Sequence, residues 1–342
     1  MKPDRVVVLG CGPAGAAAAI TLAARGISPV VVDPRPPVEW QPGEGLPSAA
    51  NALLRKLGVW PAFQSGGHLA GGGFLSCWGS DEPAFRPALL DPRGPSWQLD
   101  RPAFNRMLIA AAGAPRAHRI TEVRRDGRQW IAGPLVADFL IDATGRSSAL
   151  ARLLGVPRRV HSRLVGMVAL LPDPSPASAA SIVEATPDGW WYASRVPGDR
   201  LVTALFTDAA SARDISPGRW AALLRSTAQA GARAGDFDPP VGIKTVAAGS
   251  SALTRCAGPG WVAVGDAACA HDPLSARGLH DALSGGIAAA EAVALGDPAA
   301  IDAYARRVAA EYRAYLDDLA WFYRQEKRFP DSAFWRARSG QV

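Results

Sequence analysis

The sequence predicts a mixed α/β fold in which a Rossmann-like nucleotide-binding domain carries an inserted antiparallel-sheet domain and ends in C-terminal helices. Three observations support this prediction. A strand, a glycine-rich turn, a helix and a second strand follow one another within the first 33 residues. Alternating strand patterns dominate residues 156–246. Apolar residues then recur every three or four positions through residues 299–327, as in a long helix.

Composition and charge exclude several classes of protein. The chain has 342 residues, of which 48% are hydrophobic, so it can form the cores of about two domains. Its formal net charge is +6, but only four of its 37 basic residues are lysines, and the arginines are scattered. Scattered arginine favours ion pairs and anionic ligands over a nucleic-acid surface, so we expect no nucleic-acid partner.

Cysteine, histidine and hydropathy patterns argue against disulfides, a metal site and a membrane helix. Four cysteines without C-x-x-C spacing predict reduced thiols and a cytoplasmic location. The five histidines include no pair with metal-ligand spacing, so we expect no metal site. Glycine and proline interrupt the uncharged stretch Val6–Ala24, and no other stretch suits a membrane helix, so we expect no membrane insertion.

The first 33 residues carry a dinucleotide-binding fingerprint. Arg5–Leu9 is predicted as a buried strand, Ala16–Arg25 as a helix, and Pro29–Val32 as a second strand that ends at Asp33. In such a fingerprint one glycine permits the tight turn, one lets the backbone approach a pyrophosphate, and one brings the helix close to the strand. The acidic residue accepts hydrogen bonds from a ribose hydroxyl. The turn between the first strand and the helix reads Gly10-Cys11-Gly12-Pro13-Ala14-Gly15.

Two later segments favour FAD over NAD as the ligand. Phe139–Asp142 is predicted as a strand that leads into Ala143-Thr144-Gly145-Arg146-Ser147. Trp261–Val264 is predicted as a strand that leads into Gly265-Asp266, which resembles the Gly-Asp motif of FAD-dependent hydroxylases, whose Asp binds the ribityl chain. A helix predicted to begin near Gly278 and Leu279 would point its positive end at the flavin ring.

Nearly the whole chain resembles the flavoprotein monooxygenase superfamily of para-hydroxybenzoate hydroxylase type. Within it, the chain is most similar to the branch that includes flavin-dependent tryptophan halogenases and the flavoproteins that mature tryptophylquinone enzymes. Besides the segments above, the residues that carry the resemblance are Gly43-Glu44-Gly45-Leu46-Pro47, Ser96-Trp97-Gln98-Leu99-Asp100-Arg101, Asp272-Pro273-Leu274-Ser275, Phe322-Tyr323, Arg328-Phe329-Pro330-Asp331-Ser332 and Phe334-Trp335.

The resemblance implies a set of cofactor-binding residues. It places Gly43–Leu46 and Pro273 beside the isoalloxazine, Arg101 at the FAD phosphates, and Val123, expected at the end of a strand, against the adenine. No His or Cys lies where the family would attach a flavin, so FAD is expected to bind noncovalently. The full set of expected FAD-binding residues is Gly10, Gly12, Pro13, Ala14, Gly15, Asp33, Arg35, Glu44, Gly45, Leu46, Arg101, Val123, Asp142, Gly145, Gly265, Asp266, Pro273, Gly278 and Leu279.

The sequence departs from the halogenases of this branch at two places. Those enzymes use a lysine after the Gly-Glu segment and its helix, but residues 63–99 contain none, and Lys56 lies inside the predicted helix Ala49–Leu57. Their Trp-x-Trp-x-Ile-Pro element is altered to Trp190-Trp191-Tyr192-Ala193-Ser194-Arg195-Val196-Pro197. We therefore do not expect halogenation.

The remaining sequence predicts a second domain and a helical end. We expect a hairpin around Asp126-Gly127 within Arg119–Ile131, and one helix near Trp220–Ala230 that covers the antiparallel sheet. The helix Ala299–Lys327 is expected to pack through Tyr304, Val308, Tyr312, Tyr315, Leu319 and Phe322. The sheet strands are expected at Leu164–Leu171, Ser181–Ala185, Trp190–Ser194 and Arg200–Thr207. The expected domains are a discontinuous FAD-binding domain (1–62, 98–155 and 247–290), a substrate domain (63–97 and 156–246) and a C-terminal helical segment (291–342).

Two groups of side chains are candidates for the substrate site. Trp78, Trp97, Trp190 and Trp191 are expected to cluster where the family has its substrate cavity, either as a cavity lining for an aromatic substrate or as core filling. His271 lies next to the predicted flavin loop and is either a proton donor or a structural histidine. No catalytic acid or base, nicotinamide preference or oligomeric state follows from the sequence.

The resemblance implies a single-component FAD monooxygenase. NAD(P)H would dock transiently and reduce the flavin, O2 would add at C4a, and the distal hydroperoxide oxygen would attack an aromatic carbon. A narrower hypothesis makes the substrate a tryptophan of a protein or peptide, hydroxylated on the way to a tryptophylquinone. The alternative is a small-molecule aromatic or indole hydroxylase. A halogenase, an isoprenoid reductase and a non-catalytic FAD-binding protein are less favoured.

Overall fold

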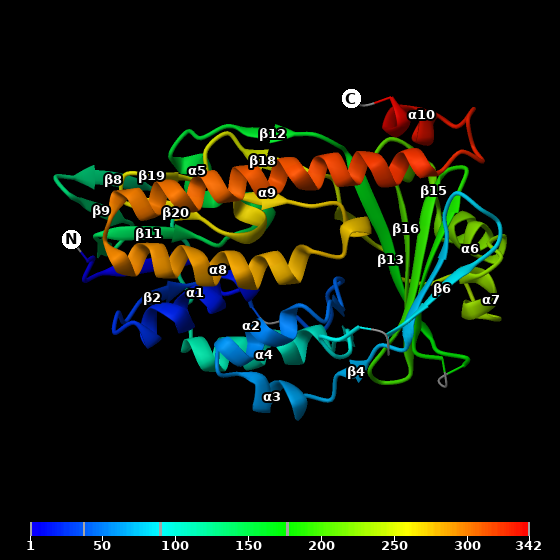
Figure 1. Ribbon diagram of the computed structural model, residues 1–342, viewed down its shortest axis with the longest axis horizontal. Helices are drawn as coiled ribbons and strands as arrows, with labels where there is room; N and C mark the ends of the chain where they lie inside the picture. The colour runs from blue at the N-terminus through cyan, green and yellow to red at the C-terminus, as the bar shows by residue number, and fades with distance from the viewer. Residues whose placement is uncertain (1, 37, 89–90, 176–177, 341–342) are drawn as a thin grey trace.

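The computed structural model describes residues 2–36, 38–88, 91–175 and 178–340. The molecule is elongated, with a parallel-sheet part at the end that holds the N-terminus and a tall antiparallel sheet at the other end (Figure 1). Two long helices, α8 (Gly278–Leu295) and α9 (Pro298–Gln325), run side by side along it. Among the described residues no helix is both long and apolar enough to cross a membrane.

A five-stranded sheet forms the centre of the nucleotide-binding part, and its order confirms the Rossmann-like prediction. The four strands β2, β1, β11 and β20 are parallel, and β19 joins the edge antiparallel. Parallel strands buried on both faces are continuous apolar runs, as in Val-Val-Val-Leu of β1. The strands are β1 (Val6–Leu9), β2 (Val30–Val32), β11 (Phe139–Asp142), β20 (Trp261–Ala263) and β19 (Ala257–Gly258).

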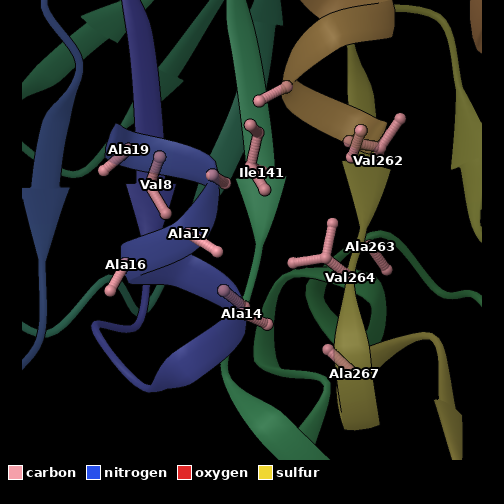
Figure 2. Close-up of a cluster of buried hydrophobic side chains, with 14 of the residues drawn as sticks. Val8, Ala14, Ala16, Ala17, Ala19, Ile141, Val262, Ala263, Val264 and Ala267 are labelled. Atoms are coloured by element: carbon pink, nitrogen blue, oxygen red, sulfur yellow. The ribbon is translucent and has the colours of Figure 1, made fainter. Parts of the chain in front are cut away.

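Small side chains let helix α1 (Pro13–Ala24) approach the sheet and α8 closely. Ala14, Ala17 and their neighbours gather with Val8, Ile141 and Val262 of three strands in one buried cluster (Figure 2). A side chain at Gly286 of α8 would lie 2.3 Å from the Ala14 carbonyl oxygen. The helix begins at Pro13, three residues before the predicted start, because proline is favoured in the first turn of a helix.

The second large sheet has seven strands in the order β17-β13-β16-β15-β14-β5-β6. All neighbours are antiparallel except β14 and β5, so the predicted antiparallel sheet is confirmed and extended by three strands, namely β17 and two from an earlier segment. The strands are β5 (Gly73–Cys77), β6 (Ala84–Pro87), β13 (Leu164–Pro172), β14 (Ala180–Thr186), β15 (Gly189–Val196), β16 (Arg200–Asp208) and β17 (Lys244–Ala247).

The two faces of this sheet pack against different helices. Because side chains alternate along a strand, Trp190 and Trp191 of β15 lie on opposite faces. Trp190 belongs to the core under the end of α9 and α10 (Ala333–Ser339), whereas Trp191 packs against Trp220 with ring centroids 5.0 Å apart. The first of these faces also contacts Leu274, from the loop before α8.

The single helix predicted near Trp220–Ala230 is wrong. The structure has α6 (Pro217–Arg225) and α7 (Ala230–Ala234), separated by a turn. The buried Glu184 carboxylate of β14 accepts hydrogen bonds from the N–H groups of Ala228, Gln229 and Ala230 at 2.7–2.9 Å. A carboxylate at that place stabilises a new helix start, which sequence periodicity does not reveal.

The stripe predicted on the C-terminal helix is largely confirmed. Tyr304, Tyr312 and Tyr315 are buried in α9, but Phe322 is 52% exposed and Tyr323 is buried in its place. Over 28 residues the buried face of a helix with 3.6 residues per turn drifts away from any fixed spacing. Tyr323 therefore faces the antiparallel sheet, where its ring lies 5.7 Å from that of Trp78.

Smaller elements complete the fold. The predicted hairpin is confirmed as β8 and β9, with Gly127 at its turn in a left-handed conformation. The three small sheets comprise β8 (Val123–Asp126), β9 (Gln129–Ala132) and β10 (Leu135–Ala137); β3 (Gly45–Leu46), β7 (Trp97–Gln98) and β4 (Leu69–Ala70); and β12 (Arg158–Val160), β18 (Ser251–Leu253) and β21 (Cys269–Ala270). The short helices are α2 (Ala50–Lys56), α3 (Trp60–Gln64), α4 (Arg101–Ala112) and α5 (Ala149–Leu153), with 3-10 turns η2 (Gly145–Ser147), η3 (Ser211–Asp214), η4 (Gly265–Ala267) and η5 (Pro273–Ser275).

Candidate functional site

The carboxyl ends of four parallel strands meet at one edge of the five-stranded sheet. The Gly10 N–H donates to the Val32 carbonyl oxygen at 2.7 Å, and the Ala143 N–H donates to the Leu9 carbonyl oxygen at 2.8 Å. The Val264 N–H donates to the Asp142 carbonyl oxygen at 2.9 Å. The loops that follow β1, β2, β11 and β20 are thereby held side by side, as in dinucleotide-binding folds.

The three fingerprint glycines have different surroundings. A Cβ on Gly10, whose φ is +98°, would lie 2.3 Å from the Ala143 carbonyl oxygen. A Cβ on Gly15 would lie 1.9 Å from the Gly10 carbonyl oxygen. A Cβ on Gly12 would meet no protein atom within 4 Å. Gly12 therefore faces open space at the N-terminus of α1, which fits a pyrophosphate held by backbone N–H groups.

Asp33 lies at the end of β2 and is tied to the fingerprint turn. Its Oδ2 accepts a hydrogen bond from the Cys11 N–H at 2.8 Å, and the Arg35 guanidinium donates to both carboxylate oxygens at 2.6 and 2.9 Å. Burial by itself would raise the pKa of the Asp33 carboxyl, but the hydrogen bonds from Arg35 and Cys11 outweigh it and lower that pKa. Asp33 is thus held ionised, so its carboxylate can only accept hydrogen bonds, which suits a ribose hydroxyl.

The loop after β20 contains the second predicted acid. Asp266 lies in η4, with 38% of its side chain exposed and its Oδ2 3.5 Å from Arg146 Nε. Arg158 Nη2 donates a hydrogen bond to the Asp266 carbonyl oxygen at 2.7 Å, which fixes the backbone of this loop. A Cβ on Gly278, the first residue of α8, would meet no protein atom within 4 Å, so this N-terminus also faces open space.

The segment Gly43–Leu46 is anchored by two buried charges. Arg101 Nη1 donates to the Gly43 carbonyl oxygen, and Glu44 Oε2 accepts from the Gly43 N–H at 2.9 Å. Burial raises the pKa of the Glu44 carboxyl, and burial lowers the pKa of the Arg101 guanidinium to about 10. Arg101 is therefore fastened to the loop expected beside the isoalloxazine, and its contact with the FAD phosphates stays a prediction.

A buried polar cluster beside Glu44 was not found from the sequence. Gln98 Nε2 donates to Ser181 Oγ at 2.7 Å, and Ser181 Oγ lies 3.0 Å from Ser194 Oγ. Tyr192 OH is 3.5 Å from Gln98 Oε1, and burial, together with the Glu44 charge, raises the pKa of Tyr192. Alternation predicts which face of a strand each residue lies on, but not which strands meet a distant loop.

Asp142 and Val123 have local contacts or positions that the sequence did not predict, and their contacts with FAD stay predictions. The Asp142 carboxylate is fully buried and accepts hydrogen bonds from Thr144 and from the Ala151 N–H at 2.6–3.1 Å. It therefore shapes the turn around Gly145, whose φ is +65°, and caps α5. Val123 begins β8, so the prediction that it ends a strand is wrong. The residue that pairs with the end of β2 is Arg116, which forms an isolated parallel bridge with Val32.

The four tryptophans expected to cluster lie in three different places, and only Trp78 and Trp190 are together. Trp78 and Trp190 make an edge contact with centroids 6.4 Å apart, but Trp191 lies on the far face of the sheet. Trp97 packs with Trp60 and Phe63 in the core of the nucleotide-binding part. Each of these rings fills a core, so the interpretation as core filling is the better one.

His271 is packed in the interior behind the loop before α8. Its ring centroid lies 4.5 Å from that of Tyr315, and its Nε2 lies 3.8 Å from Asp281 Oδ2. Nδ1 has no hydrogen-bond partner within the described part of the chain, and burial lowers the pKa of the ring. The tight packing favours the structural role over the proton donor. His280, which the sequence reasoning did not single out, also contacts Asp281, with 2.9 Å between Nδ1 and Oδ1.

Comparisons with known proteins agree on one family. The family model described as "Tryptophan halogenase" matches residues 88–342. The putative FAD-dependent oxidoreductase LodB of Marinomonas mediterranea is 27% identical over 366 residues, with 99% of this chain and 97% of LodB covered.

Solved structures show the same fold. The flavin-dependent halogenase CmlS matches with a TM-score of 0.85 and 23% identity, over 99% of this chain and 68% of CmlS. The peptidyl tryptophan dihydroxylase QhpG, described as essential for tryptophylquinone cofactor biogenesis, matches with a TM-score of 0.78 and 28% identity, over 99% of this chain and 79% of QhpG.

Proposed function

Because the chain belongs to the tryptophan halogenase family and is an FAD-dependent oxidoreductase, we propose that it hydroxylates an aromatic substrate, namely a tryptophan side chain within a protein or peptide. The observation that carries the proposal is the set of loops held side by side as in dinucleotide-binding folds, combined with the absence of lysine between residues 63 and 99. Similarity to the peptidyl tryptophan dihydroxylase QhpG over 99% of the chain favours the peptidyl substrate over a free small molecule.

Two of the four lysines, Lys56 and Lys244, have partners of their own. Lys56 Nζ forms an ion pair with Glu291 at 3.0 Å, between α2 and α8. Lys244 Nζ donates to the Trp40 carbonyl oxygen at 2.8 Å and lies 4.4 Å from the centroid of the same indole ring. Both ammonium groups are therefore held outside the segment 63–99, which itself contains no lysine, and this favours oxygen transfer over halogen transfer.

The residues of the chain would hold FAD at four points. The backbone at Gly12 and the start of α1 would bind the pyrophosphate, Asp33 the adenosine ribose, and Asp266 the ribityl chain. The N-terminus of α8 at Gly278 would stabilise negative charge at the flavin end. Bound FAD supplies two-electron reduction and oxygen activation, and these protein groups supply its orientation.

The proposed reaction balances with a nicotinamide as the reductant. For each hydroxylation, one atom of O2 replaces the hydrogen of an aromatic C–H bond as a hydroxyl group, and the other leaves as water. NAD(P)H supplies the two electrons. The sequence has one glycine fingerprint, which FAD would occupy, so the nicotinamide would dock transiently.

The test is product mass spectrometry under labelled oxygen. The FAD-loaded protein is supplied with NADH or NADPH and 18O2, and with either tryptophan-containing peptides or free indoles and phenols. The proposal predicts that a peptide gains the mass of labelled oxygen on tryptophan. Labelling of the free aromatics alone would make the protein a small-molecule hydroxylase, and labelling of no substrate would contradict the proposed function.

A further inference from the structure

We propose that Asp272 is a positioning residue that fixes the loop Pro273–Ser275 against α9 and the seven-stranded sheet. The inference rests on the proposed function, in which this loop forms one wall of the flavin site. Asp272 lies immediately before Pro273, the residue expected beside the isoalloxazine, yet its own side chain points into the protein and is 2% exposed.

Five hydrogen bonds hold Asp272 in place, one of them from the Ser275 N–H to the Asp272 carbonyl oxygen at 3.1 Å. Its Oδ1 accepts from the Leu274 N–H at 3.0 Å, and its Oδ2 accepts from Tyr323 OH at 2.8 Å. The Asp272 N–H donates to Tyr315 OH at 2.6 Å, and the Asp272 carbonyl oxygen accepts from Ser275 Oγ at 2.7 Å. The same residue therefore closes its own turn and attaches that turn to α9 at two places.

The contacts continue from the two tyrosines to other elements. Tyr323 OH accepts a hydrogen bond from Trp190 Nε1, in the middle of the seven-stranded sheet, at 3.1 Å. Tyr315 OH lies 2.6 Å from Ser250 Oγ, just before β18. Asp272 thus connects the flavin-side loop to the sheet proposed to bear the substrate and to the long helix that spans both parts.

The hydrogen bonds explain why a carboxyl group is tolerated at this position. Burying an acid away from water costs stability, but an apolar side chain of similar volume would leave the Leu274 N–H and the Tyr323 OH without an acceptor. Ala276, which follows the loop, has a left-handed backbone with φ of +50°, and such strain persists only where neighbouring contacts impose it. The hydrogen bonds of Asp272 to Leu274 and Ser275 constrain the backbone just before Ala276 in this way.

The carboxyl group also titrates in an accessible range. Burial raises the pKa of Asp272 to about 6, against the hydrogen bonds from Leu274 and Tyr323. The charged and titratable groups that face it are Tyr315 and Tyr323 of α9, Arg338 of α10 and Arg146 of η2. A change of charge at Asp272 alters the acceptor for Tyr323 OH, and with it the support of the loop.

The experiment reads the flavin environment instead of turnover. The full chain is reconstituted with FAD, and the visible circular dichroism of the bound flavin is recorded from about one pH unit below to one above the Asp272 pKa. The wild-type protein is compared with Asp272→Asn, Asp272→Ala and Tyr323→Phe. The matched control is Tyr304→Phe, a buried tyrosine of the same helix whose hydroxyl donates to the Ala263 carbonyl oxygen at 2.8 Å.

We expect the wild-type spectrum to change between two forms with a midpoint near pH 6. Asp272→Asn should keep one form throughout, because an amide accepts hydrogen bonds but does not ionise. Asp272→Ala should lack the transition and bind FAD about tenfold more weakly, as expected for one buried hydrogen bond. Tyr323→Phe should keep the transition but move its midpoint to higher pH, because it removes a hydrogen bond that lowers the pKa of Asp272. Tyr304→Phe should retain the wild-type transition.

Two results would overturn the inference. One is a transition near pH 6 that persists in Asp272→Asn; the other is a wild-type spectrum that does not change with pH. Asparagine is nearly isosteric, so this variant gives a result even if Asp272→Ala does not fold. Failure of the wild-type chain to bind FAD at all would overturn the proposed function together with the inference, and is seen before any variant is measured.

Discussion

Single residues at the edge of the parallel sheet determine whether the chain can hold a dinucleotide. Gly10 and Gly15 are glycine because a side chain would collide with the backbone of the neighbouring turn, whereas Gly12 borders open space. The Asp33 carboxylate accepts hydrogen bonds from Cys11 and Arg35, and Arg158 donates a hydrogen bond to the backbone of Asp266. Substitutions at these positions therefore separate effects on folding from effects on the cofactor.

Gly12→Asp should abolish FAD binding without unfolding the protein. The new side chain has room, but its carboxylate would occupy the space of the pyrophosphate. The measurement is flavin content after purification, together with the melting temperature of the apoprotein. Gly218→Asp, at an equally open position near the start of α6, is the control and should bind FAD normally. Wild-type flavin content in Gly12→Asp would contradict the pyrophosphate assignment.

Asp33→Ala and Asp266→Ala should differ in how they respond to excess FAD. Loss of the Asp33 hydrogen bond to the ribose should weaken affinity by about 1–3 kcal/mol, and saturating FAD should restore most of the turnover. Asp266 would set the position of the flavin ring, so Asp266→Ala should stay uncoupled and release hydrogen peroxide. FAD is titrated into both variants while product and peroxide are measured. Normal coupling in saturated Asp266→Ala would refute its placement beside the ribityl chain.

Asp272→Asn should reduce the dependence of the free energy of unfolding on pH in the acidic range. Because the folded pKa, about 6, lies above the ordinary 3.8, the folded state holds this proton more tightly than the unfolded state. Wild-type stability therefore falls as the pH rises through this window, by a total of about 3 kcal/mol. Asp272→Asn should lack this contribution in denaturant unfolding at pH values on both sides of the window. A variant profile parallel to the wild type would show that Asp272 is not buried as described.

Some helices and strands are stabilised by side chains from distant parts of the chain, as α7 is by Glu184. Patterns of β-branched and apolar residues predict β1, β11 and β13–β16, because their burial repeats regularly along the strand. The break between α6 and α7 was missed because its cause, Glu184, lies on β14 and more than 40 residues away. The small sheet β3-β7-β4 was missed for a similar reason, since two-residue strands have no periodicity.

Glu184→Gln should destabilise the protein by about 1–2 kcal/mol. The amide keeps the shape of the side chain but replaces charge-assisted hydrogen bonds to three N–H groups with weaker ones and presents an N–H group to a helix start. Denaturant unfolding measures the loss. Glu311→Gln, in an exposed pair with Arg307 on α9, is the control and should change stability by less than about 0.5 kcal/mol. Equal effects of the two substitutions would contradict the capping role.

At the scale of the whole molecule, the sequence predicts the order of the parts but not the contacts between them. The glycine fingerprint and the Gly265-Asp266 segment are local, so their positions in the fold follow from the chain order. The connections through Tyr315, Tyr323 and Asp272 join residues about 40 to 50 positions apart, and no local pattern specifies them. For the same reason the tryptophans, which attract attention in the sequence, separate into different cores once the sheet is formed.

The central claim is that this family member transfers oxygen and not halogen to its substrate. The most direct measurement supplies the FAD-loaded protein with NAD(P)H, 18O2, excess bromide and a tryptophan-containing peptide in one vessel, and records the mass of the peptide. We expect an added labelled oxygen on tryptophan and none of the paired isotope peaks of bromine. A brominated peptide without labelled oxygen would contradict it.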